Sequence, residues 1–248
     1  MKTEVRKSNA NVIANAAKLL KDGKLVAFPT ETVYGLGANA FDAKAVKQIF
    51  KVKGRPVDNP LIVHVGSKAD INLVAKNIPS VAKKLIQEFW PGPLTLVLEK
   101  RKSIPSIVSA NLQTVAIRMP SNKIALFLIC KAKVPLAAPS ANSAGKPSPT
   151  SATHVLQDLK NKIPLIVDGG STHIGLESTV LDLTTSTPTL LRPGKITLPQ
   201  LEKVLGVINL PSSKNTLTKS PGMKYKHYAP KAKVIVLHGS KKKVLKEI

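Results

Sequence analysis

Apolar positions along the chain follow two different spacings, which predict helices and short buried strands in turn. Residues 11–20 have apolar positions at helical spacing, with Ser8 or Asn9 as a cap and Gly23 as a stop. The unbroken apolar runs 25–28 and 61–65 are typical of strands buried on both faces. The same reasoning predicts further helices over residues 43–53 (capped by Asp42, stopped by Gly54), 79–89, 124–130, 152–159 (capped by Thr150 or Ser151) and 198–205, and further strands over 94–98, 114–118, 136–138, 163–167, 179–183 and 189–191.

Helices and strands interleave along the chain, which predicts an α/β protein with a mixed sheet. Several strands run into polar turns that carry Gly or Pro, and ligands of open α/β sheets bind at such strand ends. After about Val207 the composition changes to Pro, Ser, Lys and Gly. We therefore predict one domain over residues 1–206, a linker over 207–232, and the start or remnant of a second domain over 233–248.

The charge of the chain favours anionic partners. Lys and Arg number 38 against 14 Asp and Glu, which gives a formal net charge of +24. Such a field attracts polyanions such as tRNA or nucleotides, although a solubility adaptation would give the same charge. Arginine is scarce, so its positions are informative, because its rigid fork suits phosphate and carboxylate groups. It occurs only at positions 6, 55, 101, 118 and 192.

The single cysteine and the hydropathy of the chain indicate where the protein is located in the cell. Cys130 lies in the apolar run 124–130, where we expect a buried structural thiol. The first ten residues lack the apolar stretch of a signal peptide, and no apolar run approaches the ~20 residues of a membrane span. We expect a cytoplasmic protein without membrane contact.

Five polar segments near predicted strand ends are candidates for a site. The first, PTETVYGLG at 29–37, combines hydroxyls, a carboxylate and glycines, although an ordinary strand-to-helix turn would also explain it. In the second, KVKGRPVDNPL at 51–61, Lys53, Arg55 and Asn59 suit a triphosphate, although cations at a helix C-terminus also complement its dipole. The others are 138–150, 167–180 and 191–194. None is a Walker motif or a dinucleotide fingerprint, so the residues alone predict an anion site and leave the reaction open.

Taken together, these segments resemble the YrdC-like threonylcarbamoyl-AMP synthases. The resemblance rests on PTETVYGLG, KGRPVDNPLIVHV, WPGPLTLVL, TVAIRMP, PLAAPSANSAGKPSPT, IVDGG, GLESTVLDL and LLRPG, in order over residues 10–205. The segment 220–230 resembles the linker of the longer, two-domain subgroup of archaea and fungi, so residues 233–248 would be part of its Rossmann-like second domain. The resemblance implies a twisted, mixed open sheet with helices on both sides and a basic concave face.

The resemblance also implies a reaction. The amine of L-threonine captures bicarbonate or CO₂ as a carbamate, a carbamate oxygen attacks the α-phosphorus of ATP, and pyrophosphate leaves, with Mg²⁺ as the ATP-bound cofactor and no dedicated protein ligands for the metal. The product, threonylcarbamoyl-AMP, is passed by a partner complex to tRNA. The implied threonine-binding residues are Thr32, His64, Arg118, Ala138 and Ser178; the implied ATP-binding residues are Lys53, Arg55, Asn59, Thr114, Ser140, Asn142, Ser148, Arg192 and Tyr225, with Lys53 and Arg55 also catalytic.

Two other functions fit parts of the same sequence. An RNA-binding or regulatory module of this fold without synthase activity would explain the charge, but it would not need the full set Lys53, Arg55, Ser140 and Asn142. A carbamoyl-transfer domain of a hydrogenase-maturation protein would be accompanied by acylphosphatase and zinc-finger segments, and this sequence has neither.

Overall fold

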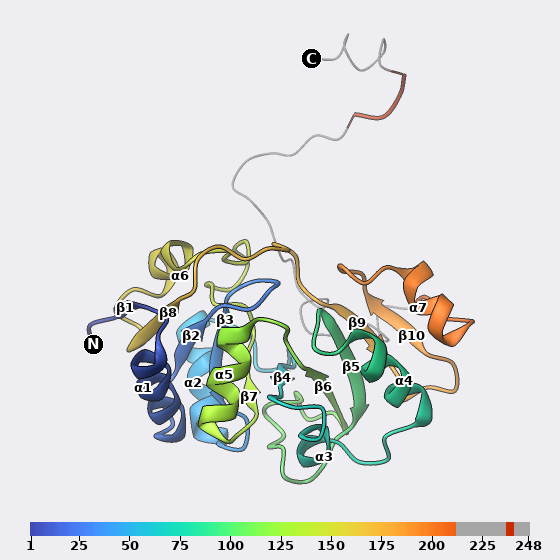
Figure 1. Cartoon of the computed structure of the whole chain (residues 1–248), viewed down its shortest axis with the longest axis horizontal. Coiled ribbons are helices and arrows are strands. Elements are labelled where there is room, and N and C mark those ends of the chain that lie inside the picture. The colour runs from blue at the N-terminus through green and yellow to red at the C-terminus, as the bar shows by residue number, and fades with distance from the viewer. Residues whose placement is uncertain (212–236, 241–248) are drawn as a thin grey trace.

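The computed structural model describes residues 1–211 and 237–240, and these residues build one large mixed sheet (Figure 1). The described strands pair in the order β1-β8-β2-β3-β7-β4-β6-β5-β9-β10. Five neighbouring pairs are antiparallel and four are parallel, among them the pair of β4 and β6. The predicted α/β class with a mixed sheet is therefore confirmed. The predicted linker and the residues 233–248 lie almost entirely outside the described residues.

The described elements agree closely with the sequence pattern. The strands are β1 (Glu4–Lys7), β2 (Val26–Phe28), β3 (Gly35–Asn39), β4 (Ile62–His64), β5 (Leu94–Glu99), β6 (Thr114–Arg118), β7 (Leu136–Ala137), β8 (Leu165–Asp168), β9 (Thr179–Asp182) and β10 (Thr189–Arg192). The helices are α1 (Ala10–Lys21), α2 (Ala43–Lys53), α3 (Ile71–Val74), α4 (Ser80–Phe89), α5 (Lys123–Ala132), α6 (Ala152–Leu159) and α7 (Leu198–Leu205).

Three predicted helix caps and one predicted helix stop are also confirmed. The side chains of Asn9, Asp42 and Ser151 each accept a hydrogen bond from a backbone N–H of the first turn that follows. Gly54 ends α2 with a φ of 64°, a left-handed conformation that glycine adopts without a steric penalty.

Helices cover both faces of the sheet around β2. Val26 and Phe28 pack with residues of α1 and α5, whereas Ala27 between them packs in the main core on the other face with residues of α2 and α6. This alternation follows from the two-residue period of a strand. Apolar residues on both faces of β2 are the reason that the strand reads as a continuous apolar run.

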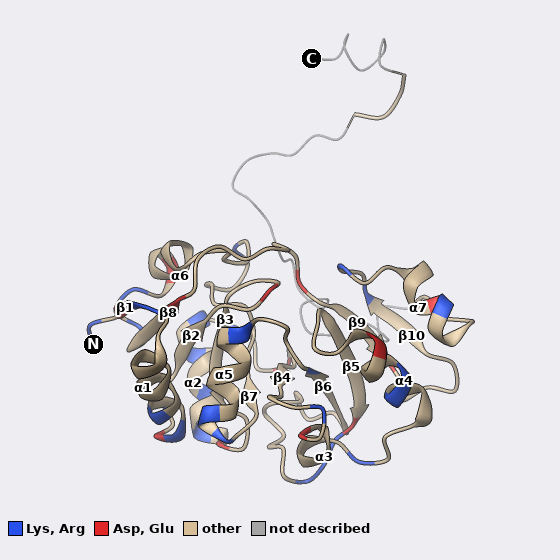
Figure 2. Ribbon diagram, viewed as in Figure 1, with Lys and Arg blue, Asp and Glu red and all other residues tan. Residues whose placement is uncertain are grey.

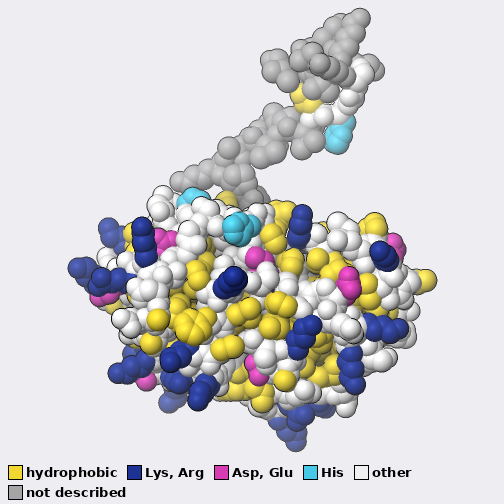
Figure 3. Space-filling model, viewed as in Figure 1, with side chains coloured by type: hydrophobic (Ala, Val, Ile, Leu, Met, Phe, Trp, Pro, Cys, Tyr) yellow, Lys and Arg dark blue, Asp and Glu magenta, His cyan; other side chains and the backbone are white. Residues whose placement is uncertain are grey.

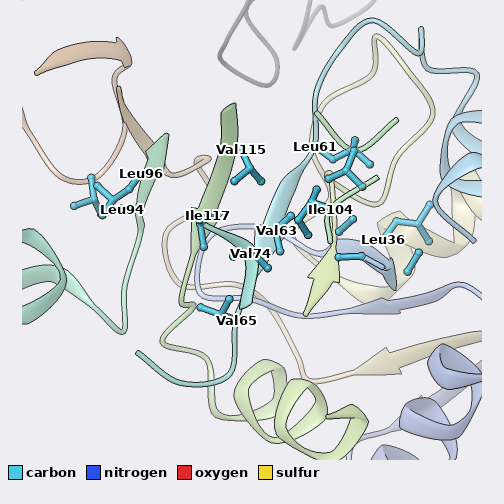
Figure 4. Packing of buried hydrophobic residues seen from close by; sticks show 14 of the residues in the cluster. Leu36, Leu61, Val63, Val65, Val74, Leu94, Leu96, Ile104, Val115 and Ile117 are labelled. Atoms are coloured by element: carbon cyan, nitrogen blue, oxygen red, sulfur yellow. The ribbon is translucent and has the colours of Figure 1, made fainter. Parts of the chain in front are cut away.

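The main core extends under the other half of the sheet. There Leu61, Val63, Val115, Ile117 and Leu96 point to one side, toward residues of α3 and α4 (Figure 4). The intervening residues Ile62, Val97, Ala116, Val180 and Leu191 form a separate buried cluster on the opposite face. That opposite face carries the functional site described below.

Three elements and one burial state differ from the sequence predictions. β1 and α3 were not predicted, because β1 is an exposed polar edge strand and α3 has only four residues. The segment after β2 does not enter a helix: it turns back as the antiparallel strand β3, whose glycines obscured the strand pattern. Cys130 is exposed and not buried, because Ala125, Leu128, Ile129 and Ala132 form the buried face of α5.

Candidate active site

One pocket lies where several strands end, and it collects most of the predicted site residues. Its lining comes from the β2–β3 turn, the segment after α2, the ends of β4, β6 and β10, and the segments after β7 and before β9. The lining residues are Thr30, Thr32, Val33, Gly35, Arg55, Pro60, Leu61, Ile62, His64, Arg118, Ala138, Pro139, Ser140, Glu177, Ser178 and Arg192. We call it the strand-end pocket.

Parallel pairing of β4 and β6 places two of these residues side by side. His64 and Arg118 are register partners at the carboxyl ends of the two strands. Ile62 and Ala116, two residues earlier, are partners on the same face and form part of the apolar floor. The sheet itself therefore fixes the spacing of the imidazole and the guanidinium.

Arg118 is buried and held from three sides. Its Nε donates a hydrogen bond to the carbonyl oxygen of Gly92 at 3.2 Å, and its Nη1 donates to Thr32 Oγ1 at 2.8 Å. Its Nη2 lies 2.6 Å from Oε1 of Glu31 in an ion pair of which both side chains are more than 90% buried. A guanidinium has five N–H groups, so this arrangement fixes its plane and leaves donors for a ligand.

His64 lies next to this ion pair in its neutral form. Burial, and secondly the positive charge of Arg118, lower the pKa of His64 to about 3. Its ring also meets the edge of Phe28, with the ring centroids 6.4 Å apart. At neutral pH His64 therefore offers one N–H donor and one ring-nitrogen acceptor, and no charge.

Several buried polar atoms of this corner have no hydrogen-bond partner among the described residues. They are both carboxylate oxygens of Glu31, Nη2 of Arg118 and Nδ1 of His64. The contact between Glu31 and Arg118 is short enough for an ion pair, but its angles do not suit a hydrogen bond. Buried polar atoms are normally paired, so this group indicates a polar ligand carrying both donors and acceptors.

Arg55 enters the pocket from the segment that follows α2. Its Nη2 donates hydrogen bonds to Asn59 Oδ1 at 2.6 Å and to the carbonyl oxygen of Pro60 at 2.9 Å. Asn59 is itself buried and does not line the pocket. Its amide therefore orients the guanidinium of Arg55 from behind.

Arg192 enters the pocket from the end of β10. Its Nε and Nη2 both donate to the carbonyl oxygen of Ser178, at 3.0 and 2.8 Å. The hydroxyl of Ser178 pairs with Thr95 of β5 at 2.7 Å. Arg192 and Ser178 are brought together because their backbone segments approach closely: a Cβ at Gly194 would lie 2.5 Å from Thr179 N and 2.8 Å from Ser178 C.

Lys53 lies beneath the loop that follows β7 and outside the pocket lining. Its Nζ donates hydrogen bonds to the carbonyl oxygens of Ser140 and Asn142, with Asn142 Oδ1 at 3.3 Å. Burial, and then the charge of Arg55, hold the pKa of Lys53 well below its usual range. Ser140 Oγ donates to the same Oδ1 at 2.6 Å, so Lys53 and Asn142 together shape the loop that carries Ser140 into the pocket.

Glu177 is the one acidic residue among the lining residues. Ser148 Oγ donates a short hydrogen bond to its Oε1. This contact joins the loop after β7 to the segment before β9, on the side of the pocket where Arg192 lies.

The structure brings together eight of the fourteen predicted site residues in one lining: Thr32, His64, Arg118, Ala138 and Ser178 from the threonine set, and Arg55, Ser140 and Arg192 from the ATP set. Four more, Lys53, Asn59, Asn142 and Ser148, each bond to a lining residue from outside. Thr114 lies at the start of β6, two residues before the partner of Ile62, and does not line the pocket. Tyr225 lies outside the described residues.

Sequence reasoning missed Thr30 and Glu177, which line the pocket, and Glu31, which pairs with Arg118 from outside the lining. Thr30 Oγ1 pairs with Thr32 Oγ1 at 2.8 Å and accepts from the backbone N–H of Val33, which shapes the β2–β3 turn. All three lie inside segments already chosen as candidates, but only the fold shows which side chains of a segment point to the site.

The fold and the site define an α/β protein whose strand-end pocket presents three buried arginines beside a group of buried polar atoms that lack hydrogen-bond partners among the described residues. The chain belongs to the Sua5, YciO and YrdC family: the family model described as "Telomere recombination" matches residues 18–194, and a model described as "Threonylcarbamoyl-AMP synthase, C-terminal domain" matches 196–247.

Relatives with curated names give the same grouping. The chain is 56% identical over 237 residues to the threonylcarbamoyl-AMP synthase of Pyrococcus abyssi, a match that covers 94% of this chain and 70% of that protein. It is 51% identical over 246 residues to the synthase of Bacillus subtilis, which covers 98% of this chain and 71% of that one. The structure is similar, with a TM-score of 0.93 and 52% identity, to P. abyssi Sua5 complexed with L-threonine, over 100% of this chain and 74% of that chain.

Two features are absent from the described residues. None of the helices in the described part of the chain is long and apolar enough to cross a membrane. Residues 1–211 and 237–240 also contain no group of three or more His, Cys, Asp or Glu side chains placed to hold a metal ion.

Proposed function

We propose that this protein is an L-threonylcarbamoyladenylate synthase, which converts L-threonine, bicarbonate or CO₂, and ATP into threonylcarbamoyl-AMP and pyrophosphate. The observation that carries the proposal is the shared lining of one pocket by the whole predicted threonine set and by Arg55, Ser140 and Arg192. The relatives named as threonylcarbamoyl-AMP synthases, at 51% and 56% identity, support the same reaction.

The buried polar atoms around Arg118 that lack hydrogen-bond partners among the described residues suit an amino acid. Arg118 carries donors for a carboxylate, and Thr32 keeps its guanidinium in place. The similar structure of P. abyssi Sua5 is a complex with L-threonine, and the five residues predicted to bind threonine line one pocket in this chain. We propose that L-threonine binds with its carboxylate on Arg118.

The other side of the pocket suits the phosphates of ATP. Arg55 and Arg192 are fixed by carbonyl and amide oxygens, so their guanidinium planes are set before a ligand arrives. Adenylyl transfer needs two substrates in line and cations near the developing negative charge, and no covalent enzyme nucleophile. We propose that Arg55, Ser140 and Arg192 bind the phosphates, with Lys53, Asn59, Asn142 and Ser148 supporting them.

Magnesium fits this pocket only as an ion carried by ATP. Mg²⁺ commonly keeps several waters and binds one or two carboxylates together with substrate phosphates. Glu177, the acidic lining residue, is one such carboxylate on the side of Arg192. We propose that Glu177 is the carboxylate available to hold Mg²⁺ brought in with ATP; the ion would supply positive charge against the phosphates.

The net positive charge of the chain supports a nucleic-acid partner. The charge of +24 supports association with tRNA and with the complex that transfers the threonylcarbamoyl group. Lys and Arg positions are scattered along the ribbon in Figure 2, and their side chains are scattered over the visible face in Figure 3. We propose tRNA binding that weakens steeply between 50 and 200 mM salt; affinity independent of salt in a filter-binding assay would contradict it.

The division into residues 1–206, 207–232 and 233–248, the contact of Tyr225 with ATP, and the cytoplasmic location all remain predictions. The alternative function is an RNA-binding or regulatory module without synthesis. It is not favoured, because the relatives that are 56% and 51% identical to this chain carry the synthase name. An Arg55→Ala variant separates the two. If the protein is a synthase, the variant should lose ATP affinity and form less product. Undiminished ATP affinity in the variant would favour the module.

The direct test of the proposal is the formation of the product. With [¹⁴C]bicarbonate, ATP, Mg²⁺ and L-threonine, the label must enter a threonylcarbamoyl adenylate resolved by chromatography. Omission of L-threonine must abolish it. If the folded protein binds ATP and yet produces no labelled adenylate under these conditions, the proposed reaction is wrong.

A further inference from the structure

Glu31 is the acidic partner of Arg118 in a buried ion pair; Arg118 lines the strand-end pocket, and Glu31 lies outside that lining. Its Oε1 lies 2.6 Å from Nη2 of Arg118, and the two side chains are 9% and 4% exposed. Burying two charges is costly, so a buried pair is weak evidence for stability and invites a functional explanation. Glu31 belongs neither to the threonine set nor to the ATP set of the proposed function.

The backbone around Glu31 is fixed by the neighbouring chain. The carbonyl oxygens of Glu31 and Thr32 accept hydrogen bonds from the N–H groups of Ile174 and Gly175, both at 3.0 Å. The Thr32 side chain bonds to the same guanidinium as Glu31. The carboxylate therefore stands at a set position beside Arg118, and both of its oxygens lack a hydrogen-bond donor among the described residues.

We infer that the pair of Glu31 and Arg118 recognises the zwitterionic head of the amino acid and rejects phosphate. Opposite charges side by side in a buried corner complement a ligand that carries a carboxylate and an ammonium on neighbouring atoms. The negative charge of Glu31, held beside Arg118, attracts the ammonium through space, and Arg118 receives the carboxylate. A phosphate group brings only negative charge, so Glu31 repels it from this side of the pocket.

This role matters because two anionic ligands would otherwise compete for one cationic pocket. Arg55, Arg118 and Arg192 all line it, and polyphosphate is attracted by each of them. Glu31 offsets the charge of Arg118 alone, to which it is paired. The pocket is thereby divided into an amino-acid side and a phosphate side, and Glu31 is a specificity-determining residue for the former.

The inference rests on the proposed function, and its test separates the two. Binding of L-threonine and of 2,3-dihydroxybutanoate, in which a hydroxyl replaces the ammonium, is measured by calorimetry on the wild type and on Glu31→Gln. Wild type should prefer L-threonine, and Glu31→Gln should reduce that preference by about 10-fold or more, as expected for the loss of one nearby charge in a buried site. Pyrophosphate should compete with L-threonine more strongly in Glu31→Gln than in wild type.

Two control variants separate the effect of the Glu31 charge from a general effect of the substitution. Glu31→Asp retains the charge and should restore most of the preference, while Glu88→Gln, an exposed carboxylate of α4, should leave it unchanged. A general loss of folding would lower the affinity for both ligands together and would show as a lower melting temperature.

The inference is overturned if folded Glu31→Gln keeps the wild-type preference for L-threonine, or if pyrophosphate competes no better than before. Failure of the proposed function gives a different result, in which wild type binds no L-threonine and forms no adenylate.

Discussion

The ammonium group of Lys53 donates a hydrogen bond to the carbonyl oxygen of Ser140 at 2.5 Å, across 87 positions of sequence (Figure 1 shows α2, which ends at Lys53). Asn142 supplies two further acceptors to the same ammonium, so its three N–H groups are directed at the loop after β7. The end of α2 and the loop that presents Ser140 are thus one unit. The predicted contact of Lys53 with phosphate stays a prediction; among the described residues its Nζ bonds to Ser140, which lines the pocket, and to Asn142, which does not.

Lys53→Met should therefore loosen the loop and weaken ATP binding more than L-threonine binding. Removing the donor leaves buried carbonyl oxygens without a partner, which costs about 1–3 kcal/mol for each group. Calorimetric titration with each ligand measures the two losses, and Lys51→Met, at an exposed position in the last turn of α2, is the matched control. Equal losses for both ligands would contradict the assignment of the loop to the ATP side.

Arg118→Ala should weaken L-threonine binding more than ATP binding, because it removes the proposed carboxylate donor. It also leaves Glu31 buried without its counter-ion, which destabilises a fold by about 3–5 kcal/mol. Calorimetry gives the two affinities and urea denaturation the stability. The exposed Arg6→Ala on β1 should change none of these quantities. Similar losses of affinity for both ligands would count against the proposed role.

Protonation of His64 should make the protein sensitive to acid. The pKa of His64 is lowered from 6.5 to about 3 in the folded state, so the unfolded state binds more protons between these values. The stabilising contribution is complete above pH 6.5 and falls by about 1.4 kcal/mol per pH unit as the pH drops toward 3. Between pH 6.5 and 4.5 a His64→Gln variant should lose about 2–3 kcal/mol less stability than wild type in urea denaturation. Identical losses would show that His64 does not titrate as the structure implies.

Gly194→Ala should disturb both halves of the pocket at once. The new Cβ would meet Thr179 N at 2.5 Å and Glu177 O at 2.7 Å, and these backbone atoms cannot move without displacing Ser178. Because Ser178 holds Arg192, affinity for L-threonine and for ATP should both fall, each by about 10-fold or more. Gly206→Ala is the control: its φ of 80° costs about 1 kcal/mol of stability, but no atom lies within 4 Å of the new Cβ. Unchanged affinities in Gly194→Ala would refute the close packing of this segment.

The sequence pattern predicted the elements that bury apolar residues and failed where burial is absent or glycine is frequent. β2 and β4 were found because both of their faces are buried, whereas β1 is exposed along its length. β3 was hidden by Gly35 and Gly37, which resemble turn residues. The space they leave is needed, because a Cβ at Gly37 would lie 2.7 Å from the ring of Phe28.

The site was predictable in its charges and less so in its contacts. In a chain with few arginines, Arg55, Arg118 and Arg192 stood out, and all three line the pocket. The pairing of Glu31 with Arg118 joins residues far apart in the sequence and depends on how two strand ends meet, which no local pattern encodes. The same is true of Lys53, whose partners are backbone oxygens of a distant loop.

The central claim is tested most directly by measuring pyrophosphate release from ATP in the presence of Mg²⁺ and bicarbonate, with and without L-threonine. The account predicts release that requires L-threonine and falls at least 100-fold in Arg55→Ala, about the loss seen when one charge-stabilising donor is removed from an active site. Release that does not depend on L-threonine, or an Arg55→Ala variant as active as wild type, would contradict it.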